Sequence, residues 1–155
     1  MRKALPLLVL PLLLSGFRAF PSLSEPDPRV VFDQFQEALD HGASMDDVYK
    51  YLSKRKVAEY QRKAEKDADG TFNNLHQNFV LMQPTLVAQE LHPDSALLVY
   101  QGSVNLNGLD YVPVTMGVLM VKEDGSWKLE RDKITYKITS EKDGQKHEES
   151  GRMAI

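Results

Sequence analysis

The chain has 155 residues, of which 42% are hydrophobic and 26% charged, and its formal net charge is −3. This length suffices for one domain with a hydrophobic core, and the composition excludes wholesale disorder. The chain contains no cysteine, which excludes disulfides, S-acylation and thiolate metal sites.

Residues 1–24 are predicted to be a secretory signal peptide. Two basic residues precede an apolar run over residues 4–14, which is too short to cross a membrane as a folded helix. Cleavage after Ser24 is favoured over cleavage after Ala19, because it places small residues at both recognition positions. The alternative is an uncleaved N-terminal anchor in the inner membrane.

Export without cysteine is compatible with a bacterial periplasm. Removal of residues 1–24 leaves 16 basic residues against 22 acidic ones, a net charge of −6. A domain of this charge has no electrostatic reason to bind nucleic acid or anionic lipid, so neither partner is expected. Stable membrane insertion is not expected once the signal peptide has been cleaved.

Two short helices are predicted at the start of the mature chain. Asp27 and Pro28 are typical of a helix N-cap and first helical position, and Gly42 should end that helix. Ser44 and Asp47 have the spacing of a capping box and predict a second helix. Apolar residues at helical spacing form the faces of these helices: Val31, Phe35, Leu39, Val48, Tyr51 and Leu52.

Two further helices are predicted over residues 53–66 and 71–82. The first has only a thin apolar stripe, and its basic residues alternate with acidic ones, which indicates a solvated helix face rather than a nucleic-acid site. Pro84 should end the second.

The centre of the predicted fold is an antiparallel sheet. A short strand over Thr85–Leu91 is followed by three longer ones, Ser95–Leu106, Tyr111–Lys122 and Ser126–Thr139. Asn107-Gly108 suits a tight hairpin because both residues tolerate positive φ. The strand Tyr111–Lys122 is apolar on both faces and should be central.

The last predicted strand changes its alternation. Trp127 and Leu129 have one parity, whereas Ile134 and Tyr136 have the other, which predicts a β-bulge near Asp132-Lys133. From residue 140 onward the chain is polar and is predicted to be a mobile tail, so the folded domain should span residues 25–139.

From Pro28 to Tyr136 the chain resembles the NTF2-like (cystatin-like α+β cone) superfamily. It is most similar to small exported bacterial members of unknown function that are often lipoproteins, although Phe17 stands where lipidation would need cysteine. The segments that carry the resemblance are Val31–Leu39, Tyr49–Ser53, Ala96–Val99 and, above all, Val121–Leu129.

The resemblance implies an α+β fold in which N-terminal helices pack on a curved antiparallel sheet of four to five strands, leaving a conical cavity. Some members of the superfamily use this cavity for catalysis, as ketosteroid isomerases, dehydratases and polyketide cyclases do. Many others are binding or assembly modules, and the fold alone does not choose between these roles.

A cone-cavity isomerase needs a buried acidic residue, and the sequence offers none within an apolar strand face. Asp110 and Asp132 are interpreted as turn and bulge residues. No metal or cofactor is expected. Aromatic and methionine side chains either fill the core or line an apolar cavity: Phe35, Tyr60, Phe79, Tyr100, Tyr111, Met116 and Trp127.

The sequence therefore predicts an exported, non-catalytic domain that binds a protein or peptide partner in the cell envelope, with a possible homodimer through the sheet. The alternative is a cone-cavity enzyme or a carrier of a small hydrophobic ligand, with Tyr100 or Tyr111 as the polar group.

Overall fold

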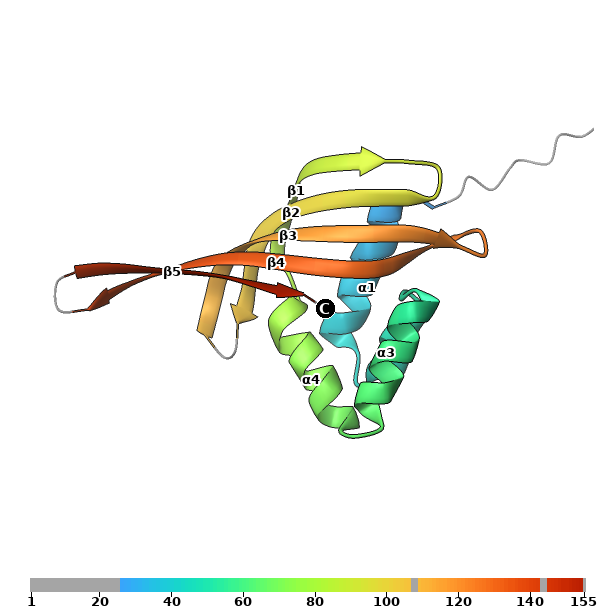
Figure 1. Ribbon diagram of the computed structural model, residues 1–155, viewed down its shortest axis with the longest axis horizontal. Helices are drawn as coiled ribbons and strands as arrows, with labels where there is room; N and C mark the ends of the chain where they lie inside the picture. The colour runs from blue at the N-terminus through green and yellow to red at the C-terminus, as the bar shows by residue number, and fades with distance from the viewer. Residues whose placement is uncertain (1–25, 107–108, 143–144, 155) are drawn as a thin grey trace, which may run out of the picture.

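The computed structural model describes residues 26–106, 109–142 and 145–154 (Figure 1). The predicted signal peptide and its cleavage site lie outside the described residues. Within them, four helices precede a five-stranded antiparallel sheet, so the α+β class is confirmed. The elements are α1 (Pro28–His41), α2 (Met45–Tyr49), α3 (Lys54–Ala64), α4 (Ala68–Phe79), β1 (Met82–Leu91), β2 (Ser95–Leu106), β3 (Leu109–Glu123), β4 (Ser126–Lys142) and β5 (Gln145–Ala154).

The first helix begins and ends where the sequence predicts, whereas the second begins at its predicted cap but ends at Tyr49, before the expected face residues Tyr51 and Leu52. The Asp27 carboxylate accepts a hydrogen bond of 2.9 Å from the Arg29 amide, and Pro28 occupies the first turn of α1. At the start of α2, the Asp47 carboxylate accepts hydrogen bonds from the backbone amides of Ala43 (2.9 Å) and Ser44 (3.1 Å). These contacts satisfy amides that have no partner within the helix.

The fourth helix begins three residues before the predicted start. The Asp67 carboxylate accepts a hydrogen bond of 2.9 Å from the Gly70 amide and thereby caps α4 ahead of Thr71. The helix ends at Phe79 because Val80 is already extended, and Met82 belongs to β1 rather than to the helix.

The strands pair in sequence order, β1-β2-β3-β4-β5, and the sheet is not closed. The bounds of β2 are those predicted, whereas β1, β3 and β4 are each longer. The predicted position of β3 at the centre of the sheet is confirmed.

The β-bulge lies close to its predicted place but not at it. Leu119 of β3 pairs with Arg131 and the adjacent Met120 pairs with Leu129, so Glu130 is the extra residue on β4. The change of parity therefore falls before Asp132 and directs its side chain to the same face as Leu129.

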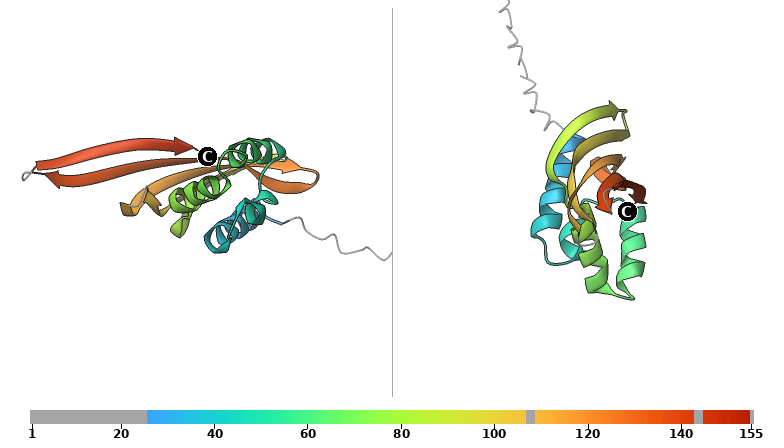
Figure 2. Two further views of the ribbon diagram at one scale, coloured as in Figure 1. Left: turned by 90° about the horizontal axis from the view of Figure 1, so that it is seen from below. Right: turned by 90° about the vertical axis from the view of Figure 1, so that its left-hand side faces the viewer.

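The prediction of a mobile tail after residue 139 is wrong. The backbone of β4 continues to Lys142 and pairs with β5 from Lys133 to its end. The segment lacks apolar alternation because little of this hairpin contacts the core: the two strands extend beyond the helices as a separate ribbon (Figures 1 and 2). Backbone pairing forms the strand without a hydrophobic pattern.

One face of the sheet, here called the inner face, packs on the helices. It carries the buried side chains of Leu98, Met116, Val118 and Ile134. The rings of Phe32 in α1 and Tyr100 in β2 lie 5.0 Å apart, which fixes the helix beneath the sheet. The opposite face is here called the outer face, and none of the helices in the described part of the chain packs against it (Figure 2).

Candidate functional site

Six of the seven candidate cavity residues are buried: Phe35, Tyr60, Phe79, Tyr100, Met116 and Trp127. The seventh, Tyr111, is 62% exposed and lies outside the core. The ring centroid of Phe35 lies 6.1 Å from that of Phe32 and 6.5 Å from that of Tyr51. These side chains pack against one another and fill the space between helices and sheet.

Tyr100, one of the two predicted polar groups, lies on the inner face near α1. Burial, and next to it the charge of Asp33, raises the pKa of the Tyr100 phenol to about 12. Burial also raises the pKa of the Asp33 carboxyl. The tyrosine therefore stays neutral at physiological pH.

The unusual polar group of the core is Asp132, which the sequence analysis interpreted as a bulge residue. That interpretation is wrong, because the side chain is fully buried and neither carboxylate oxygen has a hydrogen-bond partner. Burial raises the pKa of this carboxyl to about 7, although the charge of Lys56 acts in the opposite direction.

Two side chains of α3, Lys56 and Tyr60, lie near Asp132. The Tyr60 hydroxyl is buried without a hydrogen-bond partner, and burial together with the nearby charge of Asp132 raises its pKa. The Lys56 side chain is 5% exposed, and its Nζ lies 3.0 Å from Oε2 of Glu59. A hydrogen bond from Lys63, together with one from Lys56, lowers the pKa of the Glu59 carboxyl to about 2.

These groups border a small internal void. Besides Asp132, Tyr60, Lys56 and Arg131, its lining is apolar: Phe35, Leu52, Leu75 and Leu129. The void has no room for a water molecule. A carboxyl group with a pKa near neutrality, close to a phenol, can act in general acid–base catalysis. A substrate could reach this carboxyl group only if α3 moved away from β4.

Polar contacts join the start of α3 to β4. The Ser53 amide donates to the Leu129 carbonyl (2.8 Å), and the Leu129 amide donates to the Tyr51 carbonyl (2.7 Å). The carboxylate of the bulge residue Glu130 accepts hydrogen bonds from Ser53 and Arg55 at the start of α3. The bulge thus both buries Asp132 and ties the helix to the strand.

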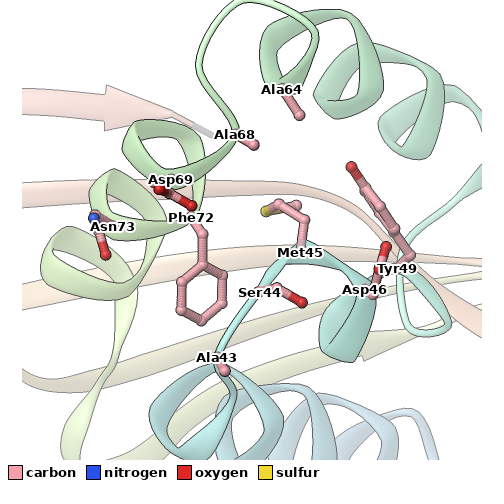
Figure 3. Close-up of a pocket in the computed structure, with 10 residues that line it drawn as sticks. All are labelled: Ala43, Ser44, Met45, Asp46, Tyr49, Ala64, Ala68, Asp69, Phe72 and Asn73. Carbon is pink, nitrogen blue, oxygen red and sulfur yellow. The ribbon is translucent and has the colours of Figure 1, made fainter.

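A second cavity, of about 290 Å³, opens on the surface between α2, α3 and α4 (Figure 3). Met45 and Phe72 lie within it, and Asp46 and Asp69 are its acidic residues. Both aspartates lie in the first turn of a helix, where the positive end of the helix dipole stabilises a negative charge. Their placement is thus explained by the helices that carry them.

The outer face of the sheet presents side chains in rows that cross the strands. One row runs from Glu90 on β1 through Leu97 and Leu119 to Arg131 on β4. The next contains Ala88, Val99, Gly117 and Lys133. Leu97 is 41% exposed and Val99 and Leu119 are partly exposed, so the centre of this face is apolar.

Among the described residues, no cluster of three or more histidine, aspartate or glutamate side chains could hold a metal ion. In the same part of the chain no helix is both long and apolar enough to cross a membrane.

The sequence analysis missed Asp132, although a signal for it was present. With the bulge at Glu130, residues 127, 129, 132 and 134 share the inner face, which places an aspartate among Trp127, Leu129 and Ile134. Comparison with known proteins adds no identification: no family model, curated protein or solved structure matches this chain.

Proposed function

We propose that this protein is an exported, non-catalytic binding module of the NTF2-like kind, which holds a protein or peptide partner in the cell envelope on the outer face of its sheet. The observation that carries the proposal is the contrast between the two faces. The inner face is filled by packed side chains, whereas the outer face exposes Leu97 beside Val99 and Leu119, and no element among residues 26–106, 109–142 and 145–154 covers them.

The NTF2-like assignment is supported by the order of the elements. Helices come first, an antiparallel sheet follows, and Trp127 is buried at the start of β4, just after the turn from β3. A curved, conical sheet remains part of the proposal. The export signal is supported by the residues of the N-terminal segment alone.

A homodimer through the sheet is the simplest assembly for such a domain. Strand β1 is an edge strand that pairs only with β2, and nearly every residue of it is exposed, including Val87 and Leu91. An edge strand directs half of its backbone amides and carbonyls away from the sheet, where a second strand can pair with them.

The test of the binding proposal is capture of partners from an envelope extract by the full chain, with mass-spectrometric identification. The double variant Leu97→Thr/Leu119→Thr removes the apolar centre while keeping strand-favouring residues. Val30→Thr is the matched control, because Val30 is 46% exposed but lies on α1.

The proposal expects wild type and Val30→Thr to capture the same protein and the double variant to lose it. Capture that is unchanged by the double variant would place the binding site elsewhere and contradict the proposal. Light scattering on the same preparations gives the oligomeric state.

The second candidate function, a cone-cavity enzyme or carrier of a small hydrophobic ligand, is favoured by one observation. Asp132 and Tyr60 are buried polar groups without hydrogen-bond partners; burying such groups destabilises a fold, so their presence in the core favours a functional role. Phenols and cyclic enones are suitable probes of this site. They should raise the melting temperature of the wild type but not that of Asp132→Asn or Tyr60→Phe; no shift in the wild type excludes this candidate.

A further inference from the structure

The outer face of the sheet is not only apolar: its apolar centre has a cationic border on one side. Arg131 and Lys133 of β4 lie beside Leu119 and Gly117, and Arg152 of β5 pairs with Thr135 one row further on. All three cationic side chains are exposed. On the opposite border, Glu90 of β1 pairs with Leu97.

These cations differ from four cations on the helical side of the molecule. Arg29, Lys54, Arg55 and Lys63 each form an ion pair with a carboxylate. By contrast, none of the three outer-face cations makes an ion pair with another residue that the structure describes. The chain has a net charge of −3, so this cationic border next to the apolar centre is a positively charged region on a negatively charged protein.

We infer that this face accepts an amphipathic helix of a partner protein, with apolar residues on Leu97 and Leu119 and carboxylates against Arg131 and Lys133. This inference rests on the proposed binding function and names the chemistry of the partner. Complementary charge around an apolar centre gives such a contact its orientation and specificity.

The spacing of the strands suits a helix. Neighbouring strands are about 4.8 Å apart, so β2 and β4 are separated by about 10 Å, which is close to the diameter of an α-helix with its side chains. A helix lying along the strands can therefore place its apolar stripe on β2 and β3 and one acidic flank on β4. An extended peptide would instead pair with the edge of the sheet.

Other occupants fit this surface less well. Residues 1–24 carry Arg2, Lys3 and Arg18 and no acidic residue, so the cationic border would repel them. An anionic membrane attracts clusters of about four to eight lysines and arginines, more than this border provides, and would repel the chain's net negative charge. A helix with an acidic flank satisfies both the apolar centre and the border.

The test uses the full chain and a synthetic helical peptide of about 14 residues, with leucines at helical spacing and glutamates along one flank. Fluorescence anisotropy measures its binding at low ionic strength and again in about 0.5 M salt, which screens exposed charges. A second peptide with lysine in place of every glutamate, and vesicles of anionic phospholipid, serve as competing probes.

The inference expects the acidic peptide to bind, the basic peptide not to bind, and salt to weaken binding. Arg131→Glu/Lys133→Glu should weaken binding about tenfold, since exposed ion pairs each contribute modestly and like charges repel. Arg62→Glu/Lys66→Glu on the opposite side of the molecule changes the net charge equally and should have little effect. Arg131→Gln/Lys133→Gln should give an intermediate loss, and circular dichroism confirms that each variant folds.

If both charge-reversal variants weakened peptide binding equally, the loss would be explained by the change in net charge alone, and the inference would be overturned. Equal binding of both peptides, or binding of vesicles but of neither peptide, would overturn it as well. If an envelope partner is captured through Leu97 and Leu119 while the Arg131→Glu/Lys133→Glu variant captures it unchanged, the binding function stands and only the acidic chemistry of the partner falls.

Discussion

Replacing Asp132 by asparagine should change the stability of the fold by an amount that depends on pH. The buried carboxyl has a pKa of about 7, against an ordinary value of 3.8, so the folded protein keeps a proton that the unfolded chain has already lost. Between these two values the unfolded state binds fewer protons than the folded state. The stability of the wild type therefore falls as the pH rises from about 4 to about 7, and this contribution is constant above that range.

The size of the effect follows from the same two values. Each unit of difference in pKa corresponds to about 1.4 kcal/mol, so ionisation of Asp132 costs about 4 kcal/mol at pH 8. The variant Asp132→Asn keeps the shape but cannot ionise. We expect it to match the wild type within about 1 kcal/mol below pH 4 and to be more stable by about 4 kcal/mol above pH 7.

Urea denaturation of both proteins at a series of pH values measures this difference directly. The matched control is Asp94→Asn, because Asp94 is an exposed aspartate in the turn before β2. It should change the free energy of unfolding by less than about 0.5 kcal/mol. A difference between Asp132→Asn and wild type that is the same at every pH, or that favours the wild type at pH 8, would refute the reasoning.

Three further predictions concern the fold. Phe35→Ala removes a ring that is almost fully buried between Phe32 and Tyr51. It should lower the free energy of unfolding, measured by urea denaturation, by about 3–5 kcal/mol. A loss below about 1 kcal/mol would mean that the core is not packed as described. Asp67→Ala removes the cap of α4 and should cost about 1 kcal/mol, whereas Asp67→Asn should restore most of it. Gly151→Val places a side chain where the ring of Tyr136 covers β5, so amide hydrogen exchange should quicken in β5 while the rates in β2 stay unchanged.

Most of the fold could be predicted from the sequence, because local chemistry specifies it. Asp27 and Ser44 mark helix starts through side-chain oxygens, and the apolar alternation of β2 and β3 specifies their inner face. The ribbon formed by the end of β4 and by β5 could not, since it packs little apolar surface and its pairing leaves no hydrophobic pattern.

The candidate sites depend on information that residue types do not carry. A displacement of the bulge from Asp132-Lys133 to Glu130 decides whether Asp132 faces solvent or the core. Likewise, the cationic border arises because Arg131, Lys133 and Arg152 meet across two strands, and this becomes visible only with the register.

The most direct test of the central claim is amide chemical-shift mapping by NMR as the captured partner, or the acidic peptide, is added to the full chain. If the outer face is the binding surface, the amide chemical shifts of Leu97, Leu119 and Lys133 should change together, and their changes should saturate with one binding constant. Shifts confined to Tyr60, Leu129 and Asp132 around the internal void would contradict the account, because they would place the function in the core.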